Sequence, residues 1–69
     1  MLRMEVDGVR IKELRLDAGL SQAELAEKAN VTRQGLSLIE RNKRNPWPRT
    51  TRRLAEALGV SVAELRRGA

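Results

Sequence analysis

The sequence predicts a small all-α domain, and three observations lead to that prediction. The chain has 69 residues, which is enough for one domain with a modest core. Its structure-breaking residues are sparse, and Gly8, Gly19, Gly59 and the Asn-Pro-Trp-Pro of residues 45–48 divide it into short pieces. Between these breaks the apolar residues follow helical spacing and β-branched runs are few, so we expect five short helices in a compact bundle.

The first helix is expected from about Gly8 to Ala18. Asp7 precedes it and can accept hydrogen bonds from its first free N–H groups as an N-cap. Gly19 suits the left-handed residue that ends it. Positions i, i+3 and i+7 of this segment form one apolar stripe, which we expect to be buried: Ile11, Leu14 and Ala18.

The second helix is expected at about Gln22–Lys28. It follows a capping box, Ser21-Gln22-Ala23-Glu24, in which the serine hydroxyl and the glutamate carboxylate satisfy each other's backbone N–H groups. Asn30 then makes a tight turn, because asparagine tolerates left-handed geometry better than most residues. The expected buried residues are Leu25, Ala26 and Ala29.

Three more helices follow in the prediction. Thr32 caps the third, at about Arg33–Arg41. Pro48 fits the first position of a fourth that reaches Leu58, and Gly59 closes it. A second capping box, Ser61-Val62-Ala63-Glu64, opens a short fifth helix.

Residues 1–7 are predicted to form an arm that precedes the folded domain of residues 8–67. Leu2, Met4 and Val6 alternate with charged residues, which is the period of a strand. A lone strand needs a partner, and we expect none from the rest of the chain. Two interpretations remain open: a frayed or loosely docked arm, or a strand that pairs across a dimer.

Composition argues against several classes of function. The chain has no Cys, no His and no Tyr, which removes thiolate ligands, the commonest metal ligand and the commonest general base. The glutamates are scattered and form no evident pair, so we expect no enzyme, no metal and no cofactor. No apolar run approaches the roughly 20 residues that span a bilayer, and no signal pattern is present. We therefore expect a soluble cytoplasmic domain.

The net charge of +5 is concentrated in one part of the chain. Residues 32–53 contain seven basic side chains against Glu40 alone, whereas residues 1–31 and 54–69 are close to neutral. Such a concentrated excess favours a surface for a polyanion over a general aid to solubility.

One face of the predicted third helix carries side chains suited to reading DNA bases. On a helical wheel Arg33, Gln34, Ser37, Leu38 and Arg41 share this face, and the opposite face is apolar. Arginine can bond guanine O6 and N7, glutamine can bond adenine N6 and N7, and leucine can contact a thymine methyl group.

Gly35 lies on the inward face of this helix, where a glycine costs about 1 kcal/mol relative to alanine. The missing side chain could let the third helix approach the second closely, which is the interpretation we favour. Simple tolerance of a suboptimal residue is the alternative.

Residues 22–41 resemble the helix-turn-helix of the phage-repressor family, the Cro/cI or XRE type. The resemblance continues through the strings GLSQAELAEKANVTRQGLSLIERNKRNP and LAEALGVSVAEL, from about Val9 to Leu65. It implies a compact five-helix lambda-repressor-like DNA-binding domain with the motif at its second and third helices. Asn30 departs from the glycine that is usual at the turn. The other motif positions are held by Ala26, Val31, Leu36 and Ile39.

The resemblance also implies roles for matching residues. Those expected to read bases in the major groove are Arg33, Gln34, Ser37 and Leu38. Those expected to contact the DNA backbone on this ground are Gln22, Asn42, Lys43 and Arg44, and we add Thr32 and Arg41 beside them as further expected backbone contacts. Arg15 and Glu40 are expected to form a structural ion pair between the first and third helices.

Several positions keep a simpler alternative. Gln22 could merely follow a helix cap, Leu38 could be an isolated surface leucine, and Lys43 and Arg44 could be solvated charges. Trp47 is expected to cap the core, with a dimer contact or a DNA-backbone contact as alternatives. The positions expected to be ordinary solvated surface are Arg49, Arg52, Arg53, Arg66 and Arg67.

The predicted function is a sequence-specific regulator of transcription, a repressor, that binds double-stranded DNA as a homodimer on a pseudo-palindrome. We expect no membrane partner and no small-molecule effector, and a location in a prokaryotic or phage-infected cell, at the nucleoid. The dimer interface is expected at the fifth helix, through Val62 and Leu65, or at the arm. The alternative function is an antitoxin-like protein-interaction module with secondary DNA binding.

Overall fold

The computed structural model describes residues 5–67, and within them it contains four α-helices and one 3-10 helix. The α-helices are α1 (Gly8–Asp17), α2 (Gln22–Lys28), α3 (Arg33–Glu40) and α4 (Pro48–Leu58). They agree with the predicted helices to within one residue at each end, and the all-α class is confirmed. Among these residues no helix is long and apolar enough to cross a membrane.

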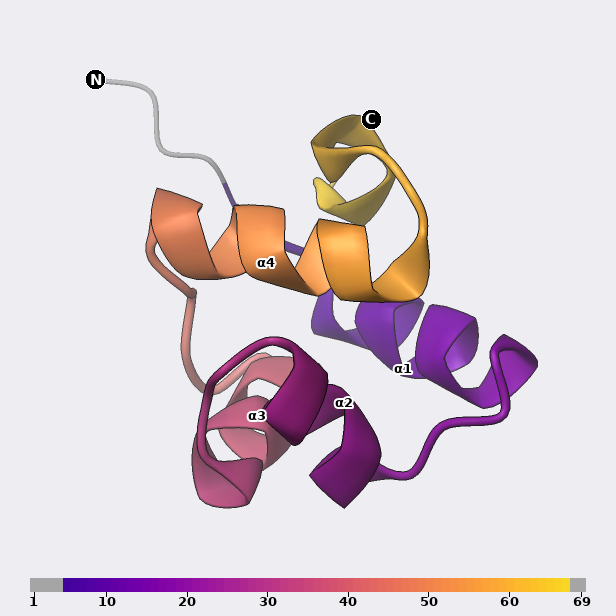
Figure 1. Ribbon diagram of the computed structural model, residues 1–69. Coiled ribbons are helices and arrows are strands. Elements are labelled where there is room, and N and C mark those ends of the chain that lie inside the picture. The colour runs from indigo at the N-terminus through magenta and orange to yellow at the C-terminus, as the bar shows by residue number, and fades with distance from the viewer. Residues whose placement is uncertain (1–4, 68–69) are drawn as a thin grey trace.

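The helices pack around one core. The pair α2–α3 lies on one side of α4, and α1 lies beside them (Figure 1). Helix α2 contacts both α3 and α4, and α1 contacts α3. The core residues that are fully buried and largest come from every element: Ile11, Leu25, Leu36, Thr51, Leu54 and Leu65.

Local capping accounts for where the helices begin and end. Asp7 accepts hydrogen bonds from the N–H groups of Val9 and Arg10, and the Ser21–Glu24 capping box is complete. Gly19 and Gly59 adopt the left-handed conformation, with φ of 73° and 71°, as predicted. Side chains that bond nearby backbone therefore fix most of the boundaries.

The prediction of a fifth α-helix is wrong. Residues Val62–Leu65 form a single 3-10 turn, η1, although Glu64 does accept a hydrogen bond from the Ser61 N–H at 3.1 Å. The turn cannot lengthen because Arg66 is already extended and forms an antiparallel bridge with Val6. Long-range pairing thus ends a segment whose local pattern is helical.

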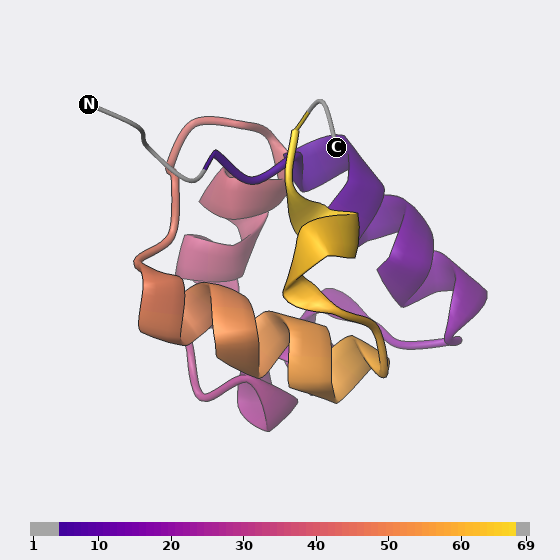
Figure 2. The same ribbon diagram turned by 90° about the horizontal axis from the view of Figure 1, so that it is seen from above.

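The expectation that the chain offers no partner to the arm is also wrong for residues 5–7. The Asp7 N–H donates to the Leu65 carbonyl at 2.8 Å, and the Arg67 N–H donates to the Glu5 carbonyl at 2.9 Å. Figure 2 shows the two terminal segments side by side. Val6 is buried in the core, while residues 1–4 of the expected arm lie outside the described residues.

Two expectations about burial need correction. Ala18 is exposed, because α1 ends one residue before it; Arg15 is buried on that side of the helix instead. Leu65 is fully buried in the core of its own chain, so it is not available as the dimer contact that was expected of it. Val62 is only partly buried.

Candidate nucleic-acid interface

Helix α3 is held from one side and exposed on the other. Leu36 and Ile39 are buried in the core, which fixes the rotation of the helix about its axis. Arg33 and Gln34 are exposed, and Ser37 and Leu38 are half-buried. The four side chains expected to read bases therefore lie together on the outer part of α3.

The N-terminus of α3 is set by the turn that precedes it. Asn30 adopts a left-handed φ of 57°, as predicted, and Val31 donates its N–H to the Ala26 carbonyl at 2.9 Å. The Thr32 hydroxyl then accepts a hydrogen bond from the Gly35 N–H at 2.9 Å. These bonds fix how α3 leaves α2, because they leave little freedom in the connecting residues.

A buried ion pair fixes the other end of α3. The Arg15 Nε and the Glu40 Oε2 are 2.7 Å apart, and a second bond joins Arg15 Nη2 to Glu40 Oε1 at 3.2 Å. Arg15 also donates to the Leu20 carbonyl at 2.9 Å, and Gln22 donates its amide N–H to Glu40 at 3.0 Å. One buried carboxylate thus joins α1, the start of α2 and the end of α3.

This arrangement satisfies the polar atoms that it buries. Within residues 5–67, no buried side-chain nitrogen or oxygen lacks a hydrogen-bond partner. Glu40 is the single acidic residue of the basic stretch 32–53, and Arg15 neutralises it inside the domain. The exposed charge of that stretch is therefore entirely positive.

The loop after α3 presents further basic side chains to solvent. Arg41, Lys43 and Arg44 are exposed, and the Lys43 N–H donates to the Leu38 carbonyl at 2.8 Å. Asn42 occupies a left-handed conformation with φ of 60°. From Arg41 to Ala55 the chain has no acidic residue. The charged side chains of the loop and of the start of α4 are therefore all basic.

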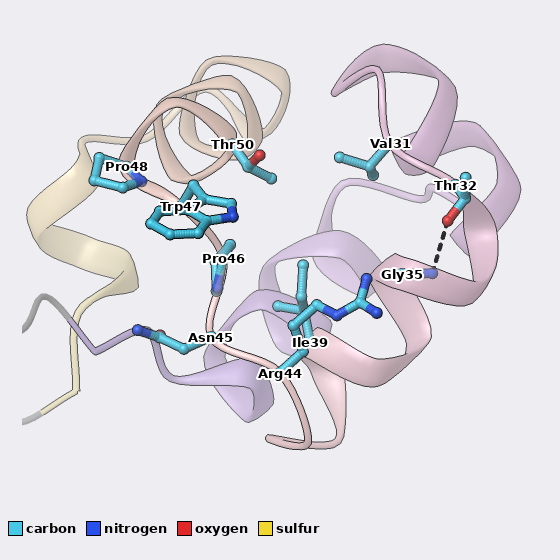
Figure 3. A pocket seen from close by; sticks show the side chains of 10 residues that line it. All are labelled: Val31, Thr32, Gly35, Ile39, Arg44, Asn45, Pro46, Trp47, Pro48 and Thr50. Carbon is cyan, nitrogen blue, oxygen red and sulfur yellow. Dashed lines mark hydrogen bonds between the residues drawn. The ribbon is translucent and has the colours of Figure 1, made fainter.

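A groove of about 680 Å³ lies between α3 and the start of α4. Figure 3 shows its lining, with the Arg44 guanidinium near Gly35 and the Trp47 ring on the side of α4. Thr32 and Arg44, both expected to contact a DNA backbone, belong to this lining. The groove is therefore continuous with the expected interface.

Two residues that line the groove, Trp47 and Gly35, do not have the roles predicted for them. Trp47 does not cap the core, because it is 81% exposed; Pro46 is buried in its place. Gly35 does not serve close packing of α3 on α2, since a side chain there would meet the Thr32 hydroxyl and the Arg44 guanidinium. The missing side chain at Gly35 instead leaves room for Arg44.

Two hydrogen bonds to Asn42 at this surface could not be predicted from the sequence. The Asn42 side-chain oxygen accepts hydrogen bonds from the Gly8 N–H and from Arg67. Asn42 is thus exposed to solvent and also hydrogen-bonded to other parts of the chain. Arg67, expected to be ordinary surface, takes part in that contact. The partners are 34 and 25 residues from Asn42, and only the path of the folded chain brings them together.

Comparisons with known proteins agree with this architecture. Residues 11–65 match the model of a protein family that is described as helix-turn-helix. The chain is 45% identical over 58 residues to the immunity repressor protein of Bacillus phage phi105, covering 84% of this chain and 40% of that protein. The chain therefore spans less than half the length of this curated relative.

Solved structures with bound DNA share the fold. The structure of SinR, a master regulator for biofilm formation, in complex with DNA superposes with a TM-score of 0.77 at 46% identity, covering 81% of this chain and 90% of that one. The P22 c2 repressor in complex with a synthetic operator superposes with a TM-score of 0.84 at 29% identity, covering 90% and 94%.

Proposed function

The chain belongs to the Cro/cI-type, or XRE-type, helix-turn-helix family, and from that premise we propose that it is a sequence-specific regulator of transcription that binds double-stranded DNA. In this proposal α3 enters the major groove and its outer residues contact base edges. The observation that carries the proposal is the outer part of α3, where Arg33 and Gln34 are exposed and Ser37 and Leu38 are half-buried. A basic loop follows this helix, and a buried ion pair holds its C-terminal end.

The proposed base readers have the chemistry that base edges require. Arg33 offers a two-pronged donor for guanine, and Gln34 offers a donor and an acceptor for adenine. Ser37 can bond either kind of edge, and Leu38 offers an apolar surface to a thymine methyl group. Because α3 is held at both ends, these side chains meet the groove from a fixed backbone.

The proposed backbone contacts surround the base readers. Thr32 precedes α3, and Arg41, Asn42, Lys43 and Arg44 follow it, so the two sets flank the groove-facing helix. Gln22 is half-buried and already donates to Glu40, which orients its side chain at the start of α2. These contacts set the register of α3 on the duplex, and the basic ones displace counterions.

The proposed regulator acts as a repressor and as a homodimer on a pseudo-palindromic operator, with half-sites roughly 10 base pairs apart. The name of the phage phi105 relative and the operator-bound P22 c2 repressor structure support the repressor part of this proposal. Such a protein works where the chromosome is, in the cytoplasm of a bacterium or of a phage-infected cell, at the nucleoid.

The proposal is tested by measuring affinity for duplex DNA as a function of salt. Arg44→Ala should weaken binding to all sequences alike and lower the slope of log affinity against log salt by about one unit. Arg10→Ala removes an equal charge from α1, where Arg10 pairs with Glu13 at 3.7 Å, and serves as the control. Affinity that does not depend on salt, or equal effects of the two substitutions, would contradict the proposed contacts.

A further inference from the structure

The loop that follows α3 is held by two segments that lie far away in the sequence. The Asn42 Oδ1 accepts a hydrogen bond from the Gly8 N–H at 2.9 Å and another from Arg67 Nη2 at 2.7 Å. Gly8 is the first residue of α1, so its N–H has no partner within that helix. A single amide oxygen therefore caps α1 and holds the C-terminal end of the described chain.

Packing at Gly8 shows that this contact is close and specific. A side chain at Gly8 would collide with the backbone carbonyls of Ile39 and Glu40, so α1 begins directly against the end of α3. Asn42 meets it from a left-handed backbone, which asparagine and glycine adopt most readily. The position thus combines a backbone requirement with a side-chain acceptor.

Arg67 is itself held in place by the terminal segments. Its N–H donates to the Glu5 carbonyl at 2.9 Å, and its guanidinium lies 4.0 Å from the Glu5 carboxylate. The next residue of the arm, Val6, donates its N–H to the Asn45 Oδ1 at 3.0 Å. The paired terminal segments consequently contact the loop at both Asn42 and Asn45.

Lys43 and Arg44 lie between these two anchored asparagines, and both are proposed to contact the DNA backbone. Arg44 and Arg67 line the same small hollow of about 180 Å³, together with Asn42 and Asn45. We infer that Arg67 is a positioning residue: through Asn42 it holds the loop of residues 42–45 in the conformation that meets the DNA backbone. This inference rests on the proposed function and adds to it a residue outside the helix-turn-helix.

The competing explanation is that Arg67 contacts phosphate directly, since it is an exposed cation near Arg44. The two explanations differ in whether the effect of Arg67 depends on Asn42. A positioning residue loses its influence when Asn42 can no longer accept its hydrogen bond, whereas a direct contact acts independently. A double-mutant cycle measures that dependence.

The cycle uses Arg67→Ala and Asn42→Gly, singly and together. Glycine removes the side chain and keeps the left-handed backbone without strain. Arg66→Ala is the matched control, because it removes the same charge one residue away and Arg66 is exposed. Affinity is measured on the preferred duplex and on an unrelated duplex, at fixed salt and at a temperature where circular dichroism shows every variant folded.

We expect Arg67→Ala to weaken binding about two- to tenfold more than Arg66→Ala, as for one charge-assisted hydrogen bond, and equally on both duplexes. In the Asn42→Gly background, Arg67→Ala should reduce the affinity for DNA no more than Arg66→Ala does. An Arg67→Ala effect that is the same in both backgrounds, or equal to that of Arg66→Ala, overturns the inference.

A second measurement separates this inference from the proposed function, because it needs no DNA. In the free protein, backbone relaxation of the Lys43 and Arg44 amides should show a more mobile loop in Arg67→Ala than in Arg66→Ala. If these amides relax identically in the two variants, Arg67 does not position the loop, whether or not the protein binds DNA. If they differ and no duplex is bound, the proposed function fails and the contact stands.

Discussion

The substitution Glu40→Leu tests the structural basis of the interface. Glu40 is 5% exposed and Arg15 is 7% exposed, so the substitution leaves a guanidinium inside the domain without its carboxylate. Gln22 loses its acceptor at the same time. We therefore expect a loss of stability well beyond that of a surface substitution.

The magnitude follows from the burial of the pair. Removing one partner of a buried ion pair costs about 3–5 kcal/mol. Domains have a total stability of roughly 0.05–0.15 kcal/mol per residue, so this loss is comparable with the whole stability of so short a chain. At about 4–8 °C per kcal/mol, the melting temperature should fall by more than 10 °C.

The assay is urea and thermal unfolding followed by circular dichroism, with Glu56→Ala as the control. Glu56 is an exposed glutamate on α4, so its loss should change stability by no more than about 0.5 kcal/mol. Adding Arg15→Met to Glu40→Leu removes the unpaired charge and should recover most of the loss. A cost below about 1 kcal/mol for Glu40→Leu, or no recovery in the double variant, would refute the reasoning.

Three further predictions concern other parts of the molecule. Gly8→Ala should destabilise the domain more than Gly35→Ala in urea titrations, because the added methyl group meets backbone at the first site and only side chains at the second; equal costs would contradict that geometry. Hydrogen bonds from the Ser21 backbone and hydroxyl lower the pKa of Glu24, so the stability advantage over Glu24→Gln should exist above the ordinary glutamate pKa and disappear as pH falls through the lowered one. Melting curves at neutral and acid pH check this, and an advantage that persists in acid would argue against it. Trp47, the only aromatic residue, should emit like a solvent-exposed tryptophan and be readily quenched by acrylamide; shielded emission from the dilute protein would contradict its exposed position.

Features that depend on neighbouring residues could be predicted from the sequence. The caps at Asp7, Ser21 and Thr32 join side chains to backbone within three residues, so the residue types alone indicate them. The two faces of α3 follow from helical periodicity, because a helix packed on one side keeps its apolar residues there. These local patterns predict the four α-helices and the exposed part of α3.

Features that depend on the path of the chain could not be predicted. The capping box at Ser61 resembles the one at Ser21, but only the box at Ser21 is followed by an α-helix. The segment after Ser61 stops at a 3-10 turn because Arg66 pairs with Val6. The size of Trp47 predicts a place in the core, yet the loop before α4 buries Pro46 and leaves the indole exposed. These positions are set by residues far apart in the sequence or by the path of a loop, and no periodic pattern in the sequence predicts them.

The central claim is that α3 reads base sequence in duplex DNA, and selection from random duplexes tests it most directly. The selection is run with the wild-type protein, with Arg33→Ala, and with Lys12→Ala on the exposed surface of α1 as the control. We predict a consensus of two inverted half-sites for the wild type and for Lys12→Ala. Arg33→Ala should lose preference at one position of each half-site, at a cost of about 1–3 kcal/mol. The absence of any consensus, or an Arg33→Ala consensus identical to that of the wild type, would contradict the claim.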